Sequence, residues 1–176
     1  MTMLKSVSAR ADAVGTFRHV SVWLMETVAR WTPSTPEMEA KVMFGRHIWD
    51  YAQMADALGK RTFELRRHEH YTAPPSAGYD AVLKDASAAR ATGDRISALY
   101  DGILPGLIAR YRDYIAGTDK ILDEPTIVIA ERIVRELERQ RAEASDLKAE
   151  LKLASGSGPL LAAREKAVRS MLAEAG

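Results

Sequence analysis

The chain has 176 residues, enough for one domain with a substantial hydrophobic core. Its 25 basic and 24 acidic residues give a net charge of +1 and are mixed along the chain, which argues against a nucleic-acid partner. The absence of cysteine excludes disulfides, zinc–thiolate sites and cysteine nucleophiles, and it fits a reducing, cytoplasmic location.

Residues 1–14 carry no clear helical pattern, and we expect them to form a flexible N-terminal arm. They contain no long apolar run, so we expect no signal peptide. No later stretch approaches the length of about 18 apolar residues that a membrane span needs. We therefore expect a helical bundle over residues 15–154 and no membrane partner.

Residues 16–31 show apolar side chains at helical spacing and predict the first long helix. Trp23 and Glu26 lie along the flank of this apolar stripe. Glu26 can point inward, where an apolar setting raises a carboxyl pKa, or it can pair with Arg30 on the surface. Its orientation decides whether it belongs to a site.

The sequence from Pro36 to Arg67 predicts a second helix of about nine turns. His47 and Asp50 lie along one edge of its apolar stripe, with Gln53 and Met54 one turn further on. A carboxylate three residues from a histidine can raise the histidine pKa and fix its tautomer, as a general acid or base requires. The alternative is a buried pair that only holds helices in register.

A third long helix is expected over residues 95–115, after a connection of about 20 residues that holds a short helix. Gly102, Pro105 and Gly106 interrupt it. A proline inside a helix removes one hydrogen bond and should kink the helix, leaving the Asp101 carbonyl without its usual partner. We expect a small apolar ligand near this kink.

Pro125 opens the fourth long helix, with Asp123 and Glu124 where negative charge stabilises a helix start. Gln140 interrupts the apolar stripe of this helix. Residues 155–176 begin with the linker sequence SGSGP and end in an amphipathic helix. We expect the apolar side of that helix to form a homodimer.

Short links join helices one and two and helices three and four, whereas a long connection separates the two pairs. This pattern is typical of the ferritin-like arrangement. The sequences DEPT at 123–126 and RHIWDYAQMADAL at 46–58 resemble bacterial ferritin-like proteins, within an overall likeness over residues 16–153. The resemblance implies an all-α, ferritin-like four-helix bundle with a long crossover between helices two and three and an extra C-terminal helix.

Metal-binding members of that superfamily use a glutamate on each of two helices and Glu-x-x-His on the other two. At the corresponding positions this chain has Asp50 and Gln53 on the second helix and Leu137 and Gln140 on the fourth. Both histidine positions therefore carry glutamine, and one carboxylate position carries leucine. We expect no di-iron centre, no other metal and no cofactor.

The expected site is an apolar space between the helices with a few polar groups, the usual form of a small-molecule site. Its tyrosines and methionine more often belong to an ordinary core, but they can also line a pocket. The candidate catalytic residues are Glu26, His47 and Asp50. The candidate substrate-binding residues are Trp23, Tyr51, Gln53, Met54, Tyr100, Tyr111 and Gln140.

We interpret the chain as a metal-independent ferritin-like protein that binds a small, largely apolar molecule. As an enzyme it would be an acid/base isomerase, cyclase or lyase, because proton transfer is the chemistry that these side chains offer. Two alternatives stay open. One is a metal-dependent ferritin-like oxidase or oxygenase with atypical ligands, and the other is a non-catalytic helical dimerisation protein.

Overall fold

The computed structural model describes residues 6–154 and 156–174, and these residues form helices and no strand. The elements are α1 (Val7–Trp31), η1 (Thr32–Ser34), α2 (Met38–Glu64), α3 (Ala77–Ser87), α4 (Thr92–Ile96), η2 (Ser97–Ile103), α5 (Leu104–Gly117), α6 (Glu124–Glu150) and α7 (Gly158–Glu174). None of the helices within these ranges combines the length and hydropathy that a bilayer span needs. The chain is all-α.

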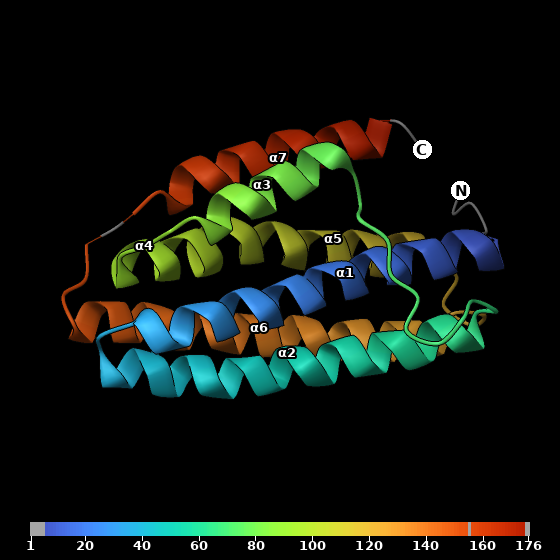
Figure 1. Cartoon of the computed structure of the whole chain (residues 1–176). Helices are drawn as coiled ribbons and strands as arrows, with labels where there is room; N and C mark the ends of the chain where they lie inside the picture. Colours follow the sequence, from blue (N-terminus) through green and yellow to red (C-terminus); the bar gives the residue numbers. More distant parts are fainter. Residues whose placement is uncertain (1–5, 155, 175–176) are drawn as a thin grey trace.

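Four long helical units lie side by side: α1, α2, the continuous helix from α4 to α5, and α6 (Figure 1). Helices α1 and α2 are antiparallel neighbours joined by the short turn η1. After α2 the chain returns through α3 to the other end of the molecule, so α2 and α4–α5 run in the same direction (Figure 1). Helix α6 then runs antiparallel to α5, and α3 and α7 cover one side of the four long units.

Helix α1 begins at Val7, so the prediction of a flexible arm over residues 1–14 is wrong for residues 7–14. The Ser6 hydroxyl caps the helix by accepting a hydrogen bond from the backbone N–H of Ala9 at 3.1 Å. Ala11 and Val14 are fully buried, and their burial stabilises this first part of the helix. Residues 1–5 lie outside the described residues.

The third long helix contains a π-helical segment, Ser97–Ile103. In a π-helix a carbonyl accepts from the fifth residue along, and for Tyr100 that residue is Pro105, which has no N–H. The Nε of Arg141 donates to the Tyr100 carbonyl instead, at 2.9 Å. We expected the Asp101 carbonyl to lack its partner because α-helical spacing pairs it with residue 105. With π-helical spacing, the carbonyl that lacks its helical partner is that of Tyr100.

The glycines next to Pro105 make room for α7. A Cβ atom on Gly102 would lie 3.0 Å from the Cβ of Leu161, and a Cβ atom on Gly106 would collide with the Glu165 carboxylate. Helix α7 therefore fills the space beside Pro105 that we expected a ligand to occupy.

Helix α7 packs against η2, α3 and α5 of its own chain. Leu161 is buried there, and Val168 is partly buried against the core, while Leu160 stays exposed. The apolar side that we expected to form a homodimer is thus largely covered within the chain. The reason to expect dimerisation through this helix therefore no longer holds.

Asp123 fixes the start of α6. Its fully buried carboxylate accepts hydrogen bonds from the hydroxyls of Thr118 and Thr126 at 2.7 and 2.6 Å. The Tyr114 hydroxyl donates at 2.5 Å, and the Nη2 of Arg61 donates at 3.2 Å. Burial opposes the charged form, but these donors outweigh it and lower the pKa of Asp123. The first residue of the DEPT sequence is therefore a structural anchor.

Candidate functional site

His47 lies at the centre of a polar network between α2, α6 and η2. Its side chain is fully buried. The Nδ1 atom lies 2.6 Å from the Tyr100 hydroxyl oxygen, and Nε2 lies 3.1 Å from Oε2 of Glu143. Burial lowers the pKa of His47 to about 4, although the hydrogen bond with Glu143 opposes this shift. The imidazole is therefore neutral at pH 7.

The partners of the ring fix its tautomer. An ionised carboxylate only accepts hydrogen bonds, so Nε2–H donates to Glu143 and Nδ1 accepts from the Tyr100 hydroxyl. Burial favours a neutral Glu143, but the hydrogen bonds from Arg46 and His47 outweigh it and lower the Glu143 pKa. The imidazole thus connects a buried phenol to a partly exposed carboxylate. This geometry can relay a proton between them.

Asp50 belongs to the same network but does not bond to His47, contrary to our expectation. Its Oδ2 atom accepts from Nε2 of Gln140 and from Nη2 of Arg139, both at 3.0 Å. His47 points instead into the core, toward Tyr100. The i,i+3 spacing on α2 places both residues in the same polar region. Different residues of α6 then bond to His47 and to Asp50, so the two side chains do not bond to each other.

Asp50 and Glu136 form a carboxyl pair across α2 and α6. Burial raises the pKa of Asp50, and the adjacent Glu136 raises it further. The pKa of Glu136 is lowered, chiefly by its hydrogen bond with Arg139, whose Nε donates at 2.8 Å. Two neighbouring carboxyl groups whose pKa values are pushed apart are a feature of acid/base sites.

This carboxyl pair opens onto a cleft of about 400 Å³ between α2 and α6. The cleft also has an apolar side, formed by Trp49, Met54, Ile129 and Ile133. A larger groove of about 810 Å³ lies between the same two helices toward the start of α2. Arg46, Arg139 and Glu143 line that groove.

The structure brings together five of the predicted site residues: His47, Asp50, Tyr51, Tyr100 and Gln140. The hydroxyls of Tyr51 and Tyr100 are neighbours, and their proximity affects both pKa values, but burial is the main cause that raises them. Among the described residues the Tyr51 hydroxyl has no hydrogen bond of regular geometry.

Gln53 and Met54 are near this group as well, because both line the cleft beside Asp50.

Three predicted site residues lie elsewhere. Glu26 is exposed and its carboxylate lies 3.7 Å from the Arg30 guanidinium, so the prediction that it points inward is wrong. Tyr111 lies on α5, beyond the π-helical segment that contains Tyr100, and stacks on Phe17 with ring centroids 4.0 Å apart. Trp23 is partly buried against the hydrophobic core and lines neither cleft.

Sequence reasoning missed Glu136, Arg139 and Glu143, all on α6. Arg139 donates to Asp50 at 3.0 Å and to Oε2 of Glu143 at 3.0 Å, and it also bonds to Glu136. These residues flank Gln140 at helical spacing, on the side of α6 that faces α2. Charged residues at helical spacing beside the polar core residue Gln140 were the sequence signal for this part of the site.

A second buried polar cluster, the Glu165 cluster, lies beneath α7 and comprises Tyr79, Arg110, Glu165 and Arg169. The Arg110 guanidinium lies 5.0 Å from the Tyr79 ring centroid and 5.1 Å from that of Phe17. Glu165 is 1 % exposed, and burial raises its pKa despite the nearby Arg169.

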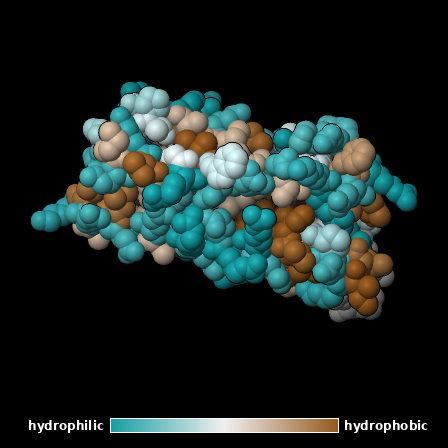
Figure 2. All heavy atoms as spheres, turned by 90° about the horizontal axis from the view of Figure 1, so that it is seen from below, coloured by the Kyte–Doolittle hydropathy of each residue, from teal (hydrophilic) through white to brown (hydrophobic). Residues whose placement is uncertain are grey.

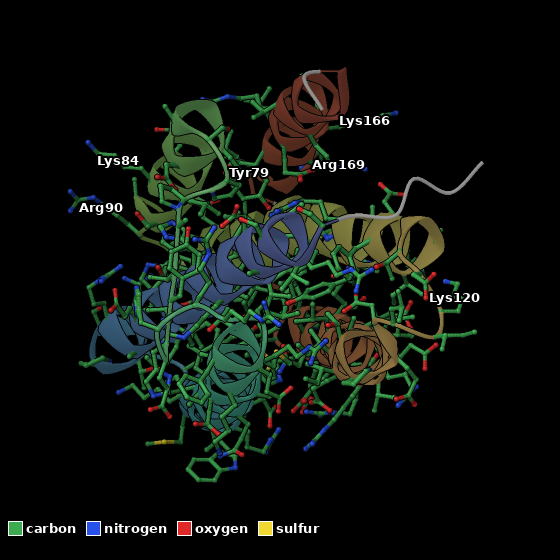
Figure 3. All side chains as sticks on the ribbon, turned by 90° about the vertical axis from the view of Figure 1, so that its right-hand side faces the viewer. Tyr79, Lys84, Arg90, Lys120, Lys166 and Arg169 are labelled. Carbon is green, nitrogen blue, oxygen red and sulfur yellow. The ribbon has the colours of Figure 1, made fainter. Side chains whose placement is uncertain are left out.

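Tyr79 on α3 and Arg169 on α7 lie between these two helices and the bundle beneath, whereas Lys84 points outward (Figure 3). Within the described residues, no regular hydrogen bond reaches the Tyr79 hydroxyl or Oε1 of Glu165. Neither of the two clefts described above reaches this cluster.

The side chains present do not fit the di-metal centre that a ferritin-like bundle implies. Leu137 is buried in the core, and Glu138 pairs with Arg112 at the surface. Across the described ranges, no three His, Asp or Glu side chains gather closely enough to share a metal ion. In comparisons with known proteins, no family model, curated protein or solved structure matches the chain.

Proposed function

We propose that the chain is a ferritin-like four-helix bundle without the di-metal ligand set, which binds a small, largely apolar molecule in the cleft between α2 and α6. The helix directions support this assignment, because two antiparallel pairs are joined by a long return through α3 (Figure 1). The bound molecule is acted on by proton transfer.

The observation that carries this proposal is the carboxyl pair at the cleft. Asp50 and Glu136 both line it, and their pKa values shift in opposite directions. The same cleft presents Met54 and Ile133 to a ligand. An apolar wall beside two unequal carboxyl groups is what an acid/base site for an apolar substrate requires.

The two carboxyl groups have different tasks in this proposal. Asp50, whose pKa is raised, is the general acid: when protonated, it gives its proton to one position of the substrate, and it then takes a proton back from another position. Glu136 is held by Arg139 with a lowered pKa, so it stays ionised and stabilises positive charge that develops nearby. Gln140 is a positioning residue that orients the Asp50 carboxylate. Isomerisation, cyclisation and elimination are the reactions that such proton transfers support.

Ligand binding is tested by thermal unfolding in the presence of a library of small apolar compounds. At least one compound should raise the melting temperature of the wild type. Ala57 lines the cleft, so Ala57→Trp should fill it and abolish this response. Ala142→Trp, which alters the other groove, is the matched control and should respond like the wild type. A library without any stabilising compound, or a full response in Ala57→Trp, would exclude this binding site.

Proton transfer is tested on the stabilising compounds in deuterated water. The wild type should catalyse exchange of a substrate hydrogen for deuterium, detected by mass spectrometry. Asp50→Asn should slow this exchange by roughly 10² to 10⁴-fold, the usual contribution of a general acid or base. Glu138→Gln changes an exposed carboxylate of α6 and should leave the rate unchanged. Equal rates in Asp50→Asn and wild type would remove the catalytic part of the proposal and leave a binding protein.

A further inference from the structure

The outer face of α2 and α6 carries an unusual concentration of exposed apolar side chains. Among the described residues nine large hydrophobic side chains are exposed, and five of them lie on these two helices. They are Met38, Val42, Trp49 and Phe63 on α2, which are 65, 50, 67 and 63 % exposed, and Val128 on α6, which is 53 % exposed. Exposed apolar side chains gathered on one face of a folded domain are typical of an interaction site.

The four apolar residues of α2 follow helical spacing and lie on one side of the helix. Three of them, Met38, Val42 and Trp49, also line the two clefts between α2 and α6. Figure 2 shows this face of the molecule, where hydrophobic patches lie between hydrophilic areas. The patches and the clefts therefore belong to one surface, which we name the α2–α6 face.

Unpaired charges differ between the two ends of the α2–α6 face. The larger groove is lined by Glu39, Asp146 and Glu150, for which the described residues provide no ion-pair partner. The smaller cleft contains Arg132, which likewise has no ion-pair partner there, and Lys60, which pairs with Asp56. One end of the face therefore has unpaired negative charge, and the other end has unpaired positive charge.

We infer that a second copy of this chain docks on the α2–α6 face in an antiparallel, twofold arrangement. A twofold axis near the middle of α2 places the acidic end of one copy opposite the Arg132 end of the other. Trp49 lies near the middle of α2, where it packs against α2 of the second copy. Self-complementary charge and a central aromatic side chain are features of a symmetric interface.

The second copy also closes the clefts. Both clefts are open to solvent in the single chain, whereas a small-molecule site usually buries 70–90 % of its ligand. The docked copy supplies the missing wall over Asp50 and Glu136. This closure rests on the proposed function, but the docking itself does not.

The test is light scattering on the full chain at several concentrations. The wild type should show twice the mass of one chain. Trp49→Glu should shift it to the mass of one chain, with a dissociation constant raised at least 30-fold. Leu160→Glu is the matched control, because Leu160 is 66 % exposed on α7, on the opposite side of the bundle (Figure 1). This control should keep the wild-type mass.

Either of two results would overturn the inference: a wild type with the mass of one chain at 100 micromolar, or a Trp49→Glu variant that keeps the wild-type mass. Circular dichroism establishes that each variant is folded, and Val42→Glu replaces Trp49→Glu if that variant is not. The mass measurement uses no ligand, so its failure is distinct from a failure of the ligand screen.

Discussion

The molecule contains two buried polar clusters that differ in their access to solvent. In the network around His47, both ring nitrogens are bonded and Asp50 accepts two hydrogen bonds, but the Tyr51 hydroxyl and Oε1 of Gln140 have no regular partner among the described residues. In the Glu165 cluster, a carboxylate oxygen and a tyrosine hydroxyl lack regular partners among the described residues. Neither of the two clefts described above reaches the Glu165 cluster, whereas residues of the first network line both of them. Unsatisfied buried polar atoms therefore occur in both clusters, and access to a cleft is what distinguishes the candidate site.

The largest expected effect that separates the two clusters is the acid sensitivity of His47. In the unfolded chain the histidine binds a proton near its ordinary pKa of 6.5, and in the folded protein it does so only near 4. Between these pH values the unfolded state takes up more protons, so the free energy of unfolding falls as the pH falls. The full effect is about 3 kcal/mol. Urea unfolding between pH 7 and pH 4 measures it, and His47→Gln should remove most of the slope. An unchanged slope in that variant would mean that the histidine is not held neutral.

A matched pair of tyrosine substitutions sharpens the comparison. Tyr100→Phe removes the donor to Nδ1 of His47 and should lower the free energy of unfolding by about 1–3 kcal/mol. Tyr79→Phe removes a hydroxyl without a regular hydrogen bond and should change the free energy of unfolding by less than about 0.5 kcal/mol. Chemical denaturation of both variants at pH 7 measures the difference. Equal losses would show that the Tyr79 hydroxyl is satisfied in solution.

The smallest expected effect is a gain of stability in the Glu165 cluster. Burial raises the pKa of Glu165, so the folded state prefers the neutral carboxyl. The contribution of Glu165 to the free energy of unfolding is greatest below the pKa that this carboxyl has in the unfolded chain. The contribution is lost as the pH rises through the higher pKa of the folded protein. Glu165→Gln should therefore stabilise the protein at pH 7 by about 1 kcal/mol. The same denaturation experiment applies, and a loss of stability would show that the charged carboxylate with Arg169 stabilises the docking of α7.

Apolar periodicity predicted the long helices, because a buried stripe on a helix is visible in the sequence itself. The start of α1 was missed, since Ala11 and Val14 are small side chains that give only a weak pattern. The predicted set of His47, Asp50, Tyr100 and Gln140 lies together because each is in or beside the apolar stripe of its helix. For residues in or beside an apolar stripe, the sequence indicates that they lie on the face of the helix that packs against the bundle.

The rest of the site depends on how neighbouring helices are rotated, which the sequence of one helix does not contain. Glu26 and Glu143 are both flanking carboxylates, yet one faces solvent and the other bonds to His47. The glycines beside Pro105 show a similar ambiguity. The sequence indicated a space there, and only the packing of α7 determines what fills it.

The π-helical segment Ser97–Ile103 has a consequence for the phase of the helix that contains it. A π-helical turn holds about one residue more than an α-helical turn, and one residue corresponds to about 100° of rotation. All side chains from Leu104 to Gly117 are therefore rotated relative to those before the segment. Tyr100 can face His47 while Gly106 and Arg110 face α7. A single extra residue thus lets one continuous helix serve two clusters with different orientations, and its deletion would misalign one of them with its partners.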